Sequence, residues 1–457
     1  MSTTTPSRLL GPLFATDAAR EIFSDGSRIQ HMLDVIAALA RAEARAGVIP
    51  QSAVRAIESS CRVERFDIDV LARATATAGN PAIPLVKELT ARVKAQDTEA
   101  AGFVHWGTTS QDTIDTALVL QLRAALVLFE ADTTRLATSL AALAEAQKHT
   151  VIAGRTLMQQ ALPVTFGLKV AGWLSAVDRH RLRLRQLKPR VLALQFGGAA
   201  GSLAALGDKG IAVAAALAEE LQLELPDSPW HTQRDRVAEV ATELGLLIGT
   251  LGKIARDVSL MMQTEIGEAF EPHASGRGGS STMPHKRNPV DSAVVLAAAL
   301  RAPALVSTML TSMVQEHERG LGGWHAEWEI LPQLCELCSG ALDRVNDTVA
   351  GLEVDAERMR ENLAATHGLI FAEAVTMALG RHIGRMPAYR LVEDACRRAV
   401  EEQRPLREVL NTDSSVAAHL PAGELDRLFN PSNYLGSAIQ IVDRVLAQHR
   451  DTNLEGA

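Results

Sequence analysis

The chain has 457 residues, of which 47% are hydrophobic and only 4% aromatic, and its formal net charge is −8. This length exceeds one ordinary hydrophobic core, and the acidic balance argues against nucleic-acid binding, which needs a basic surface. The N-terminus lacks a basic segment followed by a long apolar run, and no stretch approaches the roughly 20 apolar residues of a membrane span. We therefore expect a cytoplasmic protein with no membrane partner.

The spacing of apolar residues predicts helices throughout and no sheet, because few segments alternate apolar and polar residues. Ser27 is the predicted N-cap of a helix that ends at Gly47 and Pro50. Residues 111–149 then run without proline or glycine, and further long helices are predicted near 164–189, 235–264, 289–317 and 328–352. Helices of this length favour an extended bundle. We predict an all-α fold with a small helical domain over 1–110, a central bundle over 111–354 and a small helical domain over 355–457.

The four cysteines are too few and too unevenly spaced for a disulfide framework. Cys335 and Cys338 lie three residues apart within an apolar helical pattern, which predicts two buried thiols. A redox or metal pair is the alternative, and a zinc site would need a second pair of ligands. We expect neither a metal nor a cofactor.

Residues 105–112, His-Trp-Gly-Thr-Thr-Ser-Gln-Asp, precede the longest predicted helix. The first N–H groups of a helix are unpaired and the helix dipole is positive there, so hydroxyls at this position suit a carboxylate ligand. The alternative is a capping turn of the Thr/Ser-x-x-Asp type with a structural His105.

Residues 276–290 read Gly-Arg-Gly-Gly-Ser-Ser-Thr-Met-Pro-His-Lys-Arg-Asn-Pro-Val, which is poor helix or core material. Its glycines let the backbone approach a ligand closely, while Ser280, Lys286 and Asn288 supply a hydroxyl, a cation and an amide. A Gly/Ser linker is the alternative, but it would not need the Met-Pro-His-Lys-Arg-Asn-Pro run. The pattern predicts a catalytic loop.

This loop resembles the fumarase/aspartase superfamily signature G-S-S-x-M-P-x-K-x-N-P, and residues 154–163 are similar to its G-R-T-H-x-Q-x-A-x-P segment. The resemblance implies three domains, four chains that form a twenty-helix core, and sites shared between subunits. It also implies that Ser280 moves a proton at the carbon next to a carboxylate and that Lys286 stabilises the resulting charge. Implied substrate contacts are His105, Thr109, Ser110, Thr156, Gln159, Ser281, Met283 and Asn288. The roles of two arginines remain open. Arg155 is either a substrate ligand or a salt-bridge partner within the bundle, and Arg319 either binds a substrate carboxylate or lies at a solvated helix end.

The chain departs from that superfamily at two positions that act together. Leu157 replaces the histidine that handles the leaving group's proton, and Ala293 replaces the glutamate that orients this histidine. Hydroxide, ammonia and amines need such an acid, whereas a carboxylate, with a pKa near 4, attacks or leaves in its ionised form. The two departures together therefore favour lactone chemistry. We expect Leu157 to line a pocket that excludes water, and the alternative is that Leu157 lies in the core of the bundle.

With these departures the chain resembles the bacterial 3-carboxy-cis,cis-muconate cycloisomerase family. That resemblance implies formation of 4-carboxymuconolactone from a polycarboxylate substrate in the protocatechuate branch of aromatic catabolism. An adenylosuccinate- or argininosuccinate-type lyase that releases fumarate is the alternative enzyme. A non-catalytic helical tetramer is an alternative of another class, but it would not need Ser280, Lys286 and Asn288 together.

Overall fold

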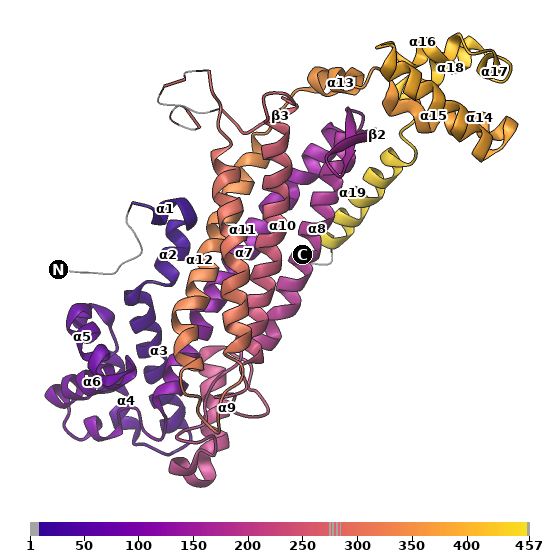
Figure 1. Cartoon of the computed structure of the whole chain (residues 1–457). Coiled ribbons are helices and arrows are strands. Elements are labelled where there is room, and N and C mark those ends of the chain that lie inside the picture. The colour runs from indigo at the N-terminus through magenta and orange to yellow at the C-terminus, as the bar shows by residue number, and fades with distance from the viewer. Residues whose placement is uncertain (1–8, 274–275, 277, 280–281, 284, 455–457) are drawn as a thin grey trace. The chain divides into compact units, whose positions relative to one another are not determined.

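The computed structural model describes residues 9–273, 276, 278–279, 282–283 and 285–454. Residues 452–454 are described by their backbone only. These residues are mostly helical, which confirms the all-α prediction (Figure 1). The long helices match the predicted segments closely, and they are α7 (Ser110–Ala146), α8 (Phe166–Val191), α10 (Asp235–Met261), α11 (Val290–Thr311) and α12 (Gly323–Ala350).

The chain divides into two compact units. Unit 1 comprises Met1–Thr133, His180–Gly252 and Val294–Asp343, and unit 2 comprises Thr134–Arg179, Lys253–Ala293 and Arg344–Ala457. The division falls inside the long helices, not at residues 110 and 354, so the three-domain boundaries stay a prediction.

Polar contacts join the long helices within each unit. In unit 1, Nδ1 of His180 on α8 lies 2.8 Å from Glu243 Oε1 on α10. In unit 2, Nε1 of Trp173 on α8 donates to Asp257 Oδ2 on α10 at 2.9 Å. Both pairs are largely shielded from water. Hydrogen bonds between shielded side chains fix the register of packed helices.

Unit 1 also holds the N-terminal helices, whose core is formed by side chains such as Leu33, Ile57 and Leu89. Its shorter elements are α1 (Gly11–Phe14), α2 (Asp17–Ile22), α3 (Asp25–Arg45), α4 (Gln51–Ser60), η1 (Val63–Arg65), α5 (Ile68–Ala78), α6 (Ala82–Gln96), η2 (Ala100–Phe103), η3 (Ala204–Lys209) and α9 (Gly210–Leu221).

The predicted start of the first long helix is wrong by one turn. Ser24, not Ser27, is the N-cap of α3, and its hydroxyl accepts the Ser27 N–H at 3.1 Å. Ser27 lies inside the first turn and donates its own hydroxyl to Ile22 O. Both serines suit a cap, and the sequence does not separate them, because Asp25 at the first helical position also favours a helix start.

The buried thiols predicted at Cys335 and Cys338 are confirmed. Both side chains of α12 are inaccessible to solvent. Burial raises the pKa of each thiol well above its ordinary value, so both remain protonated at neutral pH.

Glu43, on α3, is buried and neither of its carboxyl oxygens has a hydrogen-bond partner among the described residues. Burial raises the pKa of this carboxyl to about 8. The folded state therefore binds the proton more tightly than the unfolded chain does, where a glutamate titrates near pH 4.3.

Glu43→Gln is expected to flatten the pH dependence of stability. The wild-type free energy of unfolding should fall as pH rises from about 4.3 to about 8, by up to about 1.4 kcal/mol per pH unit. Urea unfolding of both proteins at pH 6 and pH 8 measures this fall. The exposed Glu64→Gln is the control, and a wild type and a Glu43→Gln variant with parallel pH profiles would contradict the prediction.

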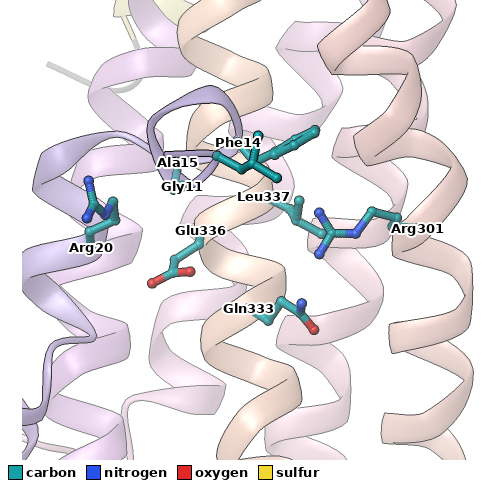
Figure 2. Close-up of a pocket in the computed structure, with 9 residues that line it drawn as sticks. Gly11, Phe14, Ala15, Arg20, Arg301, Gln333, Glu336 and Leu337 are labelled. Carbon is teal, nitrogen blue, oxygen red and sulfur yellow. The ribbon is translucent and has the colours of Figure 1, made fainter. Parts of the chain in front are cut away.

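A hollow of about 280 Å³ opens beside α1, α2 and α12 in unit 1 (Figure 2). Arg20, Arg301 and Glu336 are among the residues that line it, and the Arg301 guanidinium lies 5.4 Å from the centre of the Phe14 ring. Gly340 permits the close approach of this segment, since a Cβ there would lie 2.2 Å from Phe14 O. The lining contains none of the predicted site residues, so this hollow is not the predicted carboxylate site.

Unit 2 contains short strands, and the prediction of no sheet is wrong there. Strands β1 (Val151–Thr156) and β2 (Gln159–Thr165) form an antiparallel hairpin, and β3 (Ala269–Phe270) pairs with β4 (Glu353–Val354). The hairpin lacks the usual turn signal, because Leu157 and Met158 occupy its two loop positions with φ of 48° and 68°. Asparagine or glycine normally occupies such positions.

The rest of unit 2 is helical, and its C-terminal helices enclose a separate apolar cluster that includes Val375, Leu379 and Leu410. Its elements are α13 (Ala356–Ala364), η4 (Leu369–Phe371), α14 (Ala372–Ile383), α15 (Arg385–Glu401), α16 (Leu406–Asn411), α17 (Ser414–Ala417), α18 (Ala422–Leu428), η5 (Pro431–Asn433) and α19 (Ala438–Leu454).

Helix α11 contradicts the expectation that no stretch approaches a membrane span. It has 22 residues, and its most apolar 18-residue window has a mean hydropathy of 1.8, so length and composition alone would allow it to cross a membrane. Only 22% of its most apolar window is buried within the chain. The helix thus presents an apolar surface, which in soluble proteins marks a contact with another molecule.

Candidate active site

The turn before α7 carries His105, which is held in an uncharged state. Its φ is 58°, and its Nε2 lies 3.0 Å from Thr113 Oγ1. Burial lowers the pKa of His105 to about 4, although the charge of Asp112 acts in the opposite direction. The ring is therefore neutral at pH 7, and it offers a ligand a hydrogen bond and no charge.

Thr109 and Ser110 stand at the start of α7 beside half of a capping box. Asp112 Oδ2 accepts the Thr109 N–H at 3.1 Å, which is the reach-back half of that motif. Both hydroxyls are half-buried, and neither forms a hydrogen bond with another described residue. The capping turn and the carboxylate site are thus compatible, because Asp112 orders the turn and leaves two hydroxyls for a ligand.

Arg319 lies in the loop between α11 and α12, and the choice between a carboxylate clamp and a solvated helix end stays a prediction. Its Nη2 donates to Ala199 O at 3.0 Å, and the side chain is exposed. A main-chain carbonyl orients the guanidinium without neutralising it. Arg319 therefore keeps its charge and its remaining donors for an anionic ligand.

Arg155, on β1, forms a two-pronged ion pair in unit 2. Its Nη1 and Nη2 donate to the buried Glu268 carboxylate at 2.8 and 2.7 Å. Asn362 donates to the same carboxylate at 2.9 Å. This geometry supports the salt-bridge alternative, and it ties the hairpin to the last turn of α13 and to the segment before β3.

The three other predicted residues of this segment lie at the hairpin tip. Thr156 and Gln159 are exposed partners in the strand register, and Leu157 is 97% exposed. Leu157 therefore does not belong to the core of its own chain. Its side chain is accessible for a contact with a ligand or another subunit, and its role stays a prediction.

The catalytic loop of the sequence analysis is described in part. Ser280 and Ser281 lie outside the described residues. Lys286 and Met283 are exposed, and Lys286 N–H donates to Met283 O at 3.1 Å. Asn288 N–H donates to Gly278 O at 2.9 Å, so the two ends of the loop are joined. Gly278 has a φ of 67°, and a Cβ there would lie 2.7 Å from Asn288 O.

Two residues that the sequence analysis missed anchor this loop. Glu271 is buried and accepts the N–H groups of Asp291 and Ser292 at 3.1 and 2.8 Å, which caps α11. Arg287 donates to Glu353 Oε2 at 2.9 Å and to Glu271 O at 2.7 Å. No sequence motif indicates that Glu271 and Arg287 anchor the loop, because the residues that they contact are distant along the chain.

A buried ion network in unit 1 was also missed. Arg234 donates to Asp115 Oδ2 at 2.7 Å and, through Nε, to Glu327 Oε1 at 3.0 Å. Trp324 Nε1 donates to Asp115 Oδ1 at 2.9 Å. Burial raises the pKa of Glu327, whereas Arg234 acts to lower it. The network connects α7 and α12 to the residue that precedes α10, close to the turn that carries Thr109. Across the described residues, His, Cys, Asp and Glu side chains form no group of three suited to a metal ion.

Comparisons with known proteins agree with these motifs. A lyase family model matches residues 13–303, and a model of the adenylosuccinate lyase C-terminus matches residues 368–445. The chain is 59% identical over 455 residues to a 3-carboxy-cis,cis-muconate cycloisomerase of Pseudomonas aeruginosa, with coverage of 100% of this chain and 99% of the relative. It is 56% identical to the enzyme of the same description from Bradyrhizobium diazoefficiens, with coverage of 96% and 98%.

A solved structure gives the same result for the fold. The crystal structure of 3-carboxy-cis,cis-muconate lactonizing enzyme from Pseudomonas putida superposes with a TM-score of 0.93 and 55% sequence identity, over 98% of this chain and 100% of that one. The chain therefore belongs to the fumarase/aspartase superfamily of lyases and, within it, to the 3-carboxy-cis,cis-muconate cycloisomerase family.

Proposed function

We propose that this protein converts 3-carboxy-cis,cis-muconate to 4-carboxymuconolactone in the protocatechuate branch of aromatic catabolism. The observation that carries the proposal is the 59% identity to a cycloisomerase over the whole chain. The replacement of the superfamily's His–Glu pair by Leu157 and Ala293 supports it independently, because an internal carboxylate needs no acid to become a nucleophile.

The proposed reaction forms one carbon–oxygen bond and one carbon–hydrogen bond. A substrate carboxylate oxygen attacks one carbon of the neighbouring double bond, and the π electrons of that bond take a proton at the other carbon. Ser280 delivers this proton, and the serine oxyanion then recovers one from solvent. Lys286 stabilises both the oxyanion and the negative charge that develops on the carboxylate next to the reacting carbon.

The remaining predicted residues bind the other carboxylates. The hydroxyls of Thr109 and Ser110 have no partner within the described part of the chain, and Arg319 carries an exposed charge. His105 acts as a neutral hydrogen-bonding group, consistent with its lowered pKa of about 4. Further contacts are proposed for Thr156, Gln159, Ser281, Met283 and Asn288. Arg155 is excluded from this set because Glu268 occupies its guanidinium.

We further infer a cytoplasmic homotetramer whose sites combine residues of different subunits. Two features support this assembly. Leu157 and Met158 are 97% and 73% exposed at the hairpin tip, and α11 is apolar but only 22% buried in its most apolar window. Both surfaces need a partner, and a second copy of the chain provides one for each.

The activity is tested by mixing purified protein with 3-carboxy-cis,cis-muconate and following the loss of the ultraviolet absorption of its diene. Conversion with unchanged rate after EDTA treatment is expected, because the proposed steps use only side chains. No loss of absorption would reject the proposal. Release of fumarate from adenylosuccinate or argininosuccinate would establish the alternative lyase.

Leu157→His is expected to lower turnover about 10-fold or more, because a polar ring wets a pocket that must favour the internal carboxylate over water. It should not produce fumarase-like activity, since Ala293 cannot orient the new ring. Initial rates per folded tetramer measure the effect. Leu157→Met keeps the side chain apolar and is the control. Unchanged turnover per folded tetramer in Leu157→His would contradict the proposed role of Leu157.

A further inference from the structure

We propose that Asp112 is a positioning residue that shapes the substrate-carboxylate site without touching substrate. Its carboxylate holds the start of α7 against the loop 195–203 and occupies main-chain N–H groups that a ligand would otherwise bind. This inference rests on the proposed function for the identity of the substrate. The geometry around the Asp112 carboxylate does not depend on the proposed function.

The Asp112 side chain is buried and collects donors from separate segments of unit 1. Oδ1 accepts the Gly197 N–H at 2.9 Å and lies 2.7 Å from His231 Nε2. Oδ2 accepts the Gly198 N–H at 2.9 Å, with Thr109 N–H and Thr108 Oγ1 each at 3.1 Å. A buried carboxylate needs several strong donors, and this one has a full set.

The segments around Asp112 are packed closely against one another. A Cβ on Gly197 would lie 2.9 Å from His231 Cε1 and 2.8 Å from Pro229 Cβ. A Cβ on Gly107 would lie 2.4 Å from Leu206 Cδ2. The carboxylate therefore sits in a preformed cradle of donors, and an amide of the same shape would place an NH₂ group against N–H groups.

Asp112 is connected to both kinds of group that bind substrate in the proposed site. It accepts the N–H of Thr109, which fixes the turn that presents the Thr109 and Ser110 hydroxyls. It also accepts the N–H of Gly198, and the next residue, Ala199, accepts from Arg319 through its carbonyl at 3.0 Å. One carboxylate thus sets the spacing between the hydroxyls and the guanidinium.

A second consequence concerns the glycine loop itself. Consecutive glycine N–H groups often form a cradle for a substrate anion. Here the N–H groups of Gly197 and Gly198 both point at Asp112. The loop therefore binds an internal anion, and the substrate carboxylate is left to side-chain donors.

The test compares Asp112→Asn with Asp178→Asn. Asp178 forms the matched aspartate–histidine pair of unit 2, 2.9 Å from His449 Nδ1. We expect Asp112→Asn to raise KM about 10–100-fold while kcat falls less, because the binding groups move relative to one another. Asp178→Asn should leave KM unchanged. In hydrogen–deuterium exchange, peptides covering 104–110 and 196–203 should exchange faster only in Asp112→Asn.

Unchanged KM together with unchanged exchange in these two peptides would overturn the proposal, as would an equal KM increase in Asp178→Asn. If Asp112→Asn does not fold, His231→Phe keeps a ring but removes a single donor, and it should raise KM by a smaller factor. If the wild type does not convert the muconate, the proposed function fails, and hydrogen–deuterium exchange still decides the role of Asp112.

Discussion

Replacing Ser280 by alanine is expected to lower kcat by about 10²–10⁴-fold, the range that a positioned proton carrier contributes. The reason is that the carbon next to the carboxylate has no other predicted proton donor. Substrate binding should change little, since Ser280 is not a predicted carboxylate ligand. Steady-state rates from the diene absorption measure both effects. The exposed Ser59→Ala is the control and should match the wild type.

A mixing experiment separates loss of chemistry from loss of structure. In a shared-site tetramer, Ser280→Ala subunits reassembled with Gln159→Ala subunits should regain part of the activity, because some sites then contain neither substitution. Recovery requires verified mixed tetramers. Full activity of Ser280→Ala alone would reject the assigned proton carrier, whereas absent recovery in mixed tetramers would count against shared sites only.

Arg234→Met is expected to destabilise the folded protein by about 3–5 kcal/mol, the cost of leaving a buried charge without its partner. The substitution keeps an unbranched side chain but removes the guanidinium, and it leaves the Asp115 and Glu327 carboxylates without their cation in a site from which water is excluded. The free energy of unfolding from urea titration measures the loss at a fixed protein concentration.

The control for this substitution is Arg190→Met, which removes the exposed ion pair with Glu239. Surface pairs contribute roughly 0–1 kcal/mol, so this variant should remain close to the wild type. Adding Glu327→Gln and Asp115→Asn to Arg234→Met should recover part of the lost stability, because the unpaired charges disappear. Equal losses in Arg190→Met and Arg234→Met would show that burial of the network is not what matters.

The long helices were predictable because residues 111–149 contain no breaker and repeat their apolar positions at helical spacing. The hairpin was not, because its strands are short and its turn residues, Leu157 and Met158, are not those that sequence rules associate with a positive φ. The start of α3 was misplaced for a related reason. Two serines three residues apart satisfy the same capping rule, and only the structure shows which one accepts the hydrogen bond.

The motif residues of the site were predictable, but the residues that hold them were not. Thr109, Ser110 and Lys286 stand in recognisable local patterns. Asp112 appeared as a capping residue, and nothing in the sequence indicated that it also binds the loop 85 or more residues later. Long-range partners of this kind depend on tertiary packing, which a local pattern does not encode. For the same reason the sequence left two roles open for Arg155, a substrate ligand and a salt-bridge partner. The ion pair with Glu268 supports the second role.

The positive φ angles of Leu157 and Met158 have an energetic cost for the folded chain. Left-handed backbone costs a non-glycine residue roughly 1–2 kcal/mol, and an Asn-Gly pair would relieve most of it. A stability-guided redesign would therefore choose Asn-Gly at these two positions and delete the exposed apolar tip. Natural chains keep such strained positions where activity depends on the side chain displayed. Engineering for heat tolerance should leave this turn untouched and seek its gains elsewhere.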